Sequence, residues 1–90
     1  MMPVLKKDRE RLYAELRHHM AEGKAEEVYK ETLTQLEGYK AFLELSGNRL
    51  GEAKDVELKI EYIVMYEALT QGLGWLKRTK RRFELVKEYT

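Results

Sequence analysis

The sequence predicts an all-α fold, built as a helical hairpin followed by a long third helix. Apolar residues recur at spacings of three and four along most of the 90 residues, which is the helical period. Only one Pro is present, and no alternating run is long enough for a β-strand. A chain of this length has room for one domain, 1–90, whose modest core favours a three- or four-helix bundle completed by oligomerisation.

The first two helices are expected over about residues 4–22 and 24–46. Leu12 and Leu16 belong to an apolar stripe in the first of them, and Gly23 is a natural helix stop. The second helix opens with acidic residues in its first turn, where the helix dipole favours them. It should end before residues 46–51, which include the only Ser, the only Asn and two glycines.

The third helix, expected over about residues 52–89, carries the most regular pattern. Its apolar and small residues follow alternating steps of four and three, the heptad seam of a coiled coil. The seam consists of Leu58, Tyr62, Met65, Leu69, Gly72, Leu76, Thr79, Phe83 and Val86.

A break at residues 72–74 is the alternative to one continuous third helix. Gly72 and Gly74 together weaken a helix by about 1 to 2 kcal/mol and could turn the chain back into a fourth helix. Because the seam stays in phase through both glycines, the pattern favours a continuous or gently kinked helix, with Gly72 at a close helix crossing.

A continuous third helix would be about 57 Å long, whereas the second could cover only about 33 Å of it. The uncovered part predicts self-association, and a dimer is the simplest closed assembly. The expected interface consists of Leu69, Gly72, Leu76, Thr79, Phe83 and Val86.

Charge is distributed unevenly, although the formal net charge is only +1. Both ends are basic and residues 18–76 are acidic, so oppositely charged segments can pair within the chain or between chains. Several Lys and Arg on one helix can also bind the phosphates of a nucleic acid weakly. Such a helix can equally bind an acidic groove on a partner protein or an anionic membrane. The candidate residues for nucleic-acid or partner binding are Trp75, Lys77, Arg78, Lys80, Arg81 and Arg82.

Residues suited to catalysis are scarce. There is no Cys, the lone Ser46 lacks a nucleophile-elbow context, and no glycine-rich phosphate loop follows a strand. We therefore expect no enzyme, no catalytic residues and no cofactor. The only cluster that resembles a metal site, Glu15, His18, His19 and Glu22, is better explained by surface pairs four residues apart than by half of a two-metal site.

These features predict a small non-enzymatic interaction or regulatory protein that self-associates and binds a protein partner. The alternative is an accessory nucleic-acid-binding protein that uses the C-terminal basic helix, although no helix-turn-helix or zinc module frames that helix. A chain that turned back at residues 72–74 would gather both basic ends and favour this alternative. The longest uncharged stretch, 68–76, is too short to span a bilayer and the start does not resemble a secretory signal, so we expect a cytoplasmic protein without a membrane partner.

Overall fold

The computed structural model of the chain describes residues 5–47 and 54–88, in which it has four helices and no strand. The helices are α1 (Lys6–Ala21), α2 (Ala25–Ser46), α3 (Lys54–Gln71) and α4 (Trp75–Glu88). The predicted all-α fold is therefore confirmed. The expected helix limits at residues 4, 52 and 89 lie outside the described residues, as does most of the expected turn at 46–51.

The boundary between α1 and α2 is made by backbone geometry at Gly23. Gly23 has a φ of 72°, in the left-handed region that glycine adopts without steric cost. Its N–H donates to the carbonyl of Met20 at 3.1 Å, and the N–H of Lys24 donates to the carbonyl of His19 at 2.8 Å. These two bonds form a Schellman motif, which satisfies carbonyls at the end of α1.

A third helix boundary follows at Gly72, which also adopts a left-handed conformation, with a φ of 66°. Helix α3 ends at Gln71, and a separate helix, α4, begins at Trp75. The continuous helix favoured by the heptad phase is therefore wrong, and the fourth-helix alternative is correct. A Cβ atom added at Gly72 would meet no heavy atom within 4 Å, so this glycine serves the turn and not a close helix crossing.

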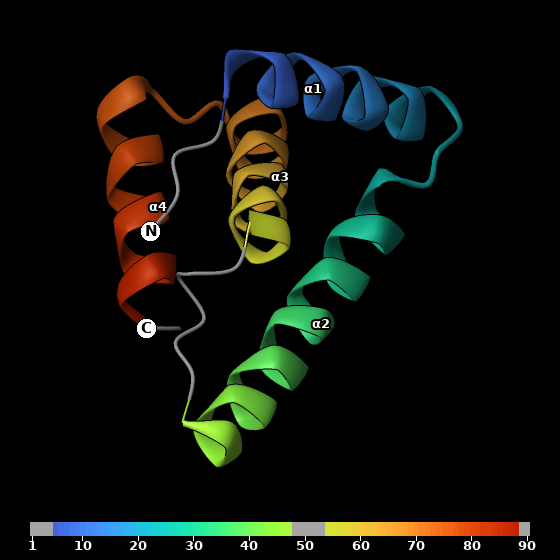
Figure 1. Cartoon of the computed structure of the whole chain (residues 1–90). Coiled ribbons are helices and arrows are strands. Elements are labelled where there is room, and N and C mark those ends of the chain that lie inside the picture. The colour runs from blue at the N-terminus through green and yellow to red at the C-terminus, as the bar shows by residue number, and fades with distance from the viewer. Residues whose placement is uncertain (1–4, 48–53, 89–90) are drawn as a thin grey trace.

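Helix α3 lies at the centre of the bundle, with α2 and α4 on either side and α1 across one end (Figure 1). All three outer helices pack against it. The turn at Gly72 sends α4 back along α3 in the opposite direction (Figure 1).

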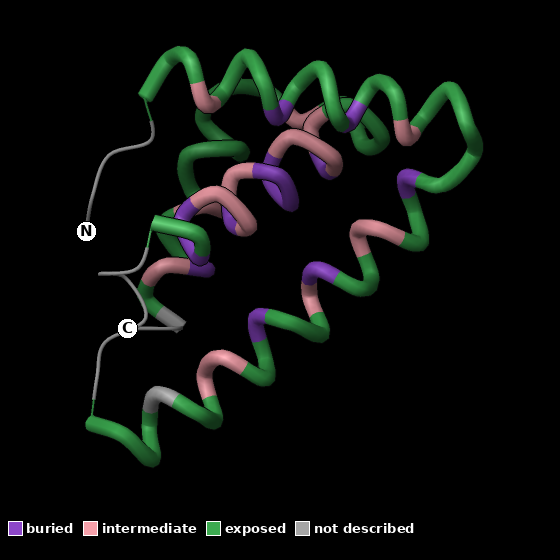
Figure 2. Tube along the Cα trace, turned by 45° about the vertical axis from the view of Figure 1, so that its right-hand side comes forward, coloured by how far each residue is buried: buried purple, intermediate pink, exposed green. Residues whose placement is uncertain are grey.

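The apolar core forms two clusters on different faces of α3, and buried positions recur along this helix (Figure 2). The first cluster joins α2, α3 and α4 through Leu36, Val56, Ile60, Ile63, Val64 and Leu85. The second joins α1, the start of α2 and α3 through Leu12, Leu16, Ala25 and Tyr62, with Leu58 and Met65 packed against it. The first part of the heptad seam therefore packs within the chain.

Candidate functional site

Helix α4 is attached to α3 largely through ion pairs, beginning with Arg81 and Glu67. Glu67 is 5% exposed, and its carboxylate accepts hydrogen bonds from Arg81 Nε at 2.9 Å and Nη2 at 3.1 Å. Tyr29 of α2 donates its hydroxyl to the same carboxylate at 2.6 Å. The hydrogen bond to Glu67 raises the pKa of Arg81, and burial together with that carboxylate raises the pKa of Tyr29 to about 12. This network links three helices.

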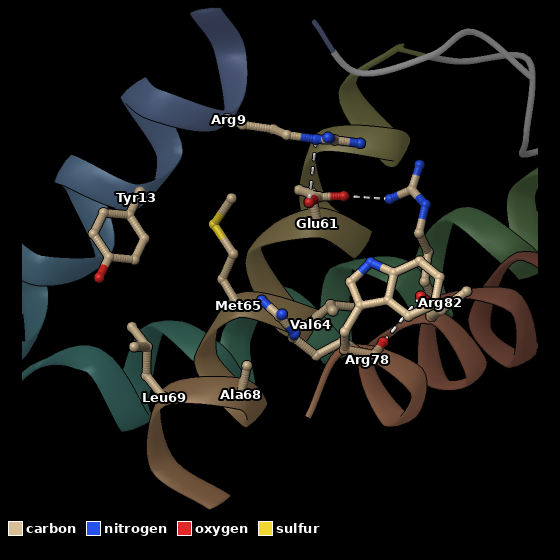
Figure 3. Close-up of a pocket in the computed structure, with 11 residues that line it drawn as sticks. Arg9, Tyr13, Glu61, Val64, Met65, Ala68, Leu69, Arg78 and Arg82 are labelled. Carbon is tan, nitrogen blue, oxygen red and sulfur yellow. Dashed lines mark hydrogen bonds and ion pairs between the residues drawn. The ribbon is translucent and has the colours of Figure 1, made fainter. Parts of the chain in front are cut away.

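A second ionic cluster lies one residue further along α4. Arg82 forms ion pairs with Glu57, which is 1% exposed, and with Glu61. Arg9 of α1 reaches Glu61 from the other side, with 3.5 Å between Nε and Oε1 (Figure 3). Among the described residues, no hydrogen-bond partner is found for Oε2 of Glu57.

The same cluster changes the proton affinity of its members. Burial lowers the pKa of Arg82, and the charge of Arg9 acts in the same direction. Burial raises the pKa of Glu61, against the opposing effects of Arg9 and Arg78. At Glu61 desolvation thus outweighs the attraction of the nearby arginines, and at Arg82 desolvation and the charge of Arg9 act together, as expected when charges are packed between helices.

Because the basic side of α4 packs against α3, much of its apolar side faces outward. Leu76 is 75% exposed, Phe83 67% and Trp75 68%. Leu85 is the buried hydrophobic residue of α4 among those described, and Val86 packs against the core at its edge. The apolar stripe that the sequence indicated is present, and it is Leu76 and Phe83 that form its outward part.

The residues of the expected oligomer interface do not lie on one helix. The turn at Gly72 places Leu69 at the end of α3 and the later members on α4. Leu69, Leu76, Thr79 and Phe83 are exposed on the described chain. The continuous seam is thus corrected, whereas self-association itself stays a prediction.

The candidate basic residues separate into two groups. Arg81 and Arg82 pair with buried or half-buried carboxylates of α3. Pairing within the chain was one of the two alternatives that the charge pattern left open. Lys77, Arg78 and Lys80 are exposed, and their side chains make no hydrogen bond or ion pair with the described residues. Sequence analysis did not identify the three acids that hold α4. The sequence does contain a signal for them, because Glu57, Glu61 and Glu67 lie among the apolar residues of α3, the helix that supplies most of the apolar core.

The histidines of α1 take part in separate contacts. His18 Nε2 lies 2.7 Å from Glu22 Oε1, the expected pair four residues apart. His19 Nδ1 lies 2.6 Å from the hydroxyl of Tyr62 instead of pairing with Glu15. Within residues 5–47 and 54–88, no group of three or more metal-binding side chains is close enough to hold an ion.

Comparison of the chain with protein-family models, curated proteins and solved structures finds no significant match. None of the described helices is long and apolar enough to cross a membrane.

Proposed function

We propose that this chain is a non-enzymatic interaction protein that self-associates through the outward face of α4. The observation that supports this proposal is the packing of α4, which places the half-buried Arg81 and Arg82 against α3 and leaves Leu76 and Phe83 exposed to solvent. An exposed apolar stripe of this kind is typical of an interaction surface, and large aromatic side chains commonly anchor such contacts. Covering it would remove apolar area from water without disturbing the ion pairs beneath.

The best occupant for this face is α2 of a second copy. The C-terminal half of α2 presents its own apolar stripe, formed by Ala41, Phe42 and Leu45, all exposed at helical spacing. The stripe on α2 is apolar like the stripe on α4. The two helices also carry opposite net charge, acidic on α2 and basic on α4.

Charge distinguishes this arrangement from contact between two copies of α4. Among the α4 residues whose side chains the structure describes, the exposed charged ones are Lys77, Arg78, Lys80 and Lys87 with the acid Glu84, so two such faces would repel. The exposed face of α2 carries the acids Glu27, Glu31 and Glu44. A dimer in which each copy places α4 on α2 of the other is the smallest closed assembly of this kind.

The test uses one variant for each face, with mass measured by analytical ultracentrifugation. Leu76→Glu with Phe83→Glu should disable the α4 face, and Phe42→Lys with Leu45→Lys should disable the α2 face. We expect the unmodified chain to associate and each variant alone to be a monomer with unchanged helical circular dichroism. Ala14→Glu, at an exposed position of α1, is the matched control and should associate normally.

Mixing the two variants tests which faces meet. An α4-to-α2 contact predicts that the mixture forms a one-to-one pair, because each variant retains the face that the other lacks. Variants that stay monomeric on mixing would contradict this contact, and a monomeric unmodified chain would overturn self-association. An acidic helix from a different protein would then be the remaining occupant of the α4 face.

The alternative function, nucleic-acid binding, is favoured by one observation. The turn at Gly72 brings α4 beside Arg9 of α1 and leaves Lys77, Arg78 and Lys80 exposed and unpaired among the described residues. The pairing of Arg81 and Arg82 with α3 reduces the charge left for phosphates.

Titration of duplex and single-stranded oligonucleotides at low and near-physiological salt tests this alternative. Binding that weakens steeply with salt and is lost when the three exposed bases become Gln would support it. No binding in a gel shift at low salt would exclude it.

A further inference from the structure

A cavity of about 350 Å³ opens between α1, α3 and the start of α4 (Figure 3). One side of it is apolar and comes from α3, where Val64, Met65 and Ala68 lie within about one helical turn. Tyr13 of α1 and Trp75 of α4 supply aromatic walls. Sites that bind small molecules in proteins commonly have this size and this mixture of apolar surface with a few polar groups.

The polar edge of the cavity is lined by Arg9, Arg78 and Arg82, with Glu61 among them. Arg9 and Arg82 are both engaged with Glu61 (Figure 3). Arg78 differs from them, because its guanidinium makes no hydrogen bond or ion pair with the described residues. The cavity therefore combines an apolar surface with one positive group that makes no hydrogen bond or ion pair in the described chain and acts on Glu61 only at longer range.

We propose that this cavity binds a small amphipathic carboxylate, with its apolar body against α3 and its carboxylate at Arg78. A guanidinium presents a planar pair of N–H groups that matches the two oxygens of a carboxylate. The nearby charge of Glu61 disfavours a ligand with a second negative charge, so a monoanion fits better than a phosphate dianion. The apolar surface selects an alkyl or aryl body over a sugar.

Trp75 makes this binding observable without a label. It is the only Trp in the chain, it lines the cavity, and its side chain is 68% exposed. An alkyl chain that settles beside the indole removes water from it, which should shift its fluorescence emission to shorter wavelength.

The experiment titrates the full chain with decanoate and, separately, with decanol and inorganic phosphate. We expect a saturable emission shift with decanoate, confirmed as one site per chain by calorimetry, and weaker binding of decanol and phosphate by about tenfold or more. Equal affinity for decanol and decanoate would overturn the role of Arg78. The absence of saturable decanoate binding would overturn the site.

Three variants locate the ligand. Arg78→Gln should weaken decanoate binding by about tenfold, whereas Lys77→Gln removes the same charge from the neighbouring position, outside the cavity, and should leave it unchanged. Ala68→Leu should block the cavity and abolish binding. Equal losses in Arg78→Gln and Lys77→Gln would show general charge attraction, and unchanged binding in Ala68→Leu would show that the apolar body lies elsewhere; either outcome contradicts the proposal.

Two measurements separate this result from self-association and misfolding. The mass of each sample, measured with and without decanoate, shows whether an emission shift follows a change in assembly. A shift that vanishes in Phe42→Lys with Leu45→Lys, the α2 variant that is expected to be monomeric and lies outside the cavity, while that variant keeps its helical circular dichroism, would assign the signal to association and overturn the site. A retained shift supports it.

Discussion

The two sides of α3 hold their neighbouring helices by different forces. On the side of α2, Leu36 packs against Val56, Ile60 and Ile63, all of which are almost completely buried. On the side of α4, Leu85 contributes to the apolar cluster, but most of the named contacts are ion pairs made by Arg81 and Arg82. Helix α2 is held mainly by apolar burial, whereas α4 is held by partly buried ion pairs together with Leu85.

This difference explains why the two helices present different surfaces. A helix held by its apolar face turns its polar face to solvent, which is the usual arrangement. A helix held by its charged face must turn apolar residues outward, as α4 does with Leu76 and Phe83. Paired buried charges contribute little net stability but fix the position of a helix, because any misplacement leaves a charge unpaired. The ionic contact therefore orients α4 and frees its apolar side for another use.

The largest effect is expected from Arg82→Ala, which leaves the carboxylate of Glu57 buried without its partner. Loss of one member of a buried pair costs about 3 to 5 kcal/mol of unfolding free energy, measured by urea denaturation. Lys80→Ala, two residues away and exposed, should change it by less than about 0.5 kcal/mol. A loss below about 1 kcal/mol for Arg82→Ala would mean that the pair does not orient α4 as described.

On the apolar side, Ile63→Ala should cost about 2 to 5 kcal/mol, because the side chain is fully buried and its removal leaves a cavity. Replacing Glu57 by Leu together with Arg82 by Met tests the contrast between the two sides. This double replacement should recover most of the stability that Arg82→Ala loses, since no charge is left buried. A double variant as unstable as Arg82→Ala would show that the charges are needed for stability and not only for orientation.

Gly72→Ala should cost about 1 to 2 kcal/mol, because a side chain at a φ of 66° is strained even with open space around it. Gly74→Ala is the control, since Gly74 lies in the same turn without a positive φ and also has no atom near an added Cβ. Thermal denaturation of both variants gives the comparison. If Gly72→Ala is neutral, the chain does not reverse at this residue, and α4 could extend α3.

A smaller effect on the unfolding free energy is expected from pH, through Glu61 on the side of α3 that faces α4. Burial raises the pKa of Glu61 above its ordinary value of 4.5, so the native state holds this proton to higher pH than the unfolded chain does. The contribution of Glu61 to stability is therefore fully present below pH 4.5 and is lost as pH rises through the raised pKa. Urea denaturation across this window should show a decline for the unmodified chain that Glu61→Gln lacks, and parallel profiles would contradict it.

The first two helices were predictable from local signals, whereas the separation of α3 from α4 and the packing of α4 were not. Leu12, Leu16 and Gly23 mark α1 and its end through spacing and backbone preference, which depend on neighbours in the chain. The sequence did not decide whether the helix breaks at Gly72. The heptad pattern of apolar residues continues through this glycine without interruption, and that pattern favoured one continuous helix. Charge patterning indicated that the basic end could pair with the acidic middle, but it did not identify Glu57, Glu61 and Glu67. The cavity at Arg78 depends on three helices meeting, and no single-helix pattern contains that information.

The smallest effect on the folded chain is expected from Phe83→Ser, which lies two residues from Leu85 on the opposite side of the same helix. Phe83 is 67% exposed, so its replacement should change the unfolding free energy of the monomer by less than about 0.5 kcal/mol. Leu85→Ala, at a buried position, should cost about 2 to 5 kcal/mol. A large cost for Phe83→Ser in dilute solution would contradict the outward orientation of this side chain.

The dependence of this last result on protein concentration separates two causes of any loss at Phe83. Association stabilises the folded state by mass action, so a contact made by Phe83 with a second copy contributes more as the concentration rises. A loss that is negligible in dilute solution and grows with concentration would assign Phe83 to an interface between copies, whereas a loss of constant size would assign it to the fold of one chain. Because Leu85→Ala removes a core contact, its cost should stay the same across the series. The two neighbouring residues thus test whether α4 has one stabilising face or two.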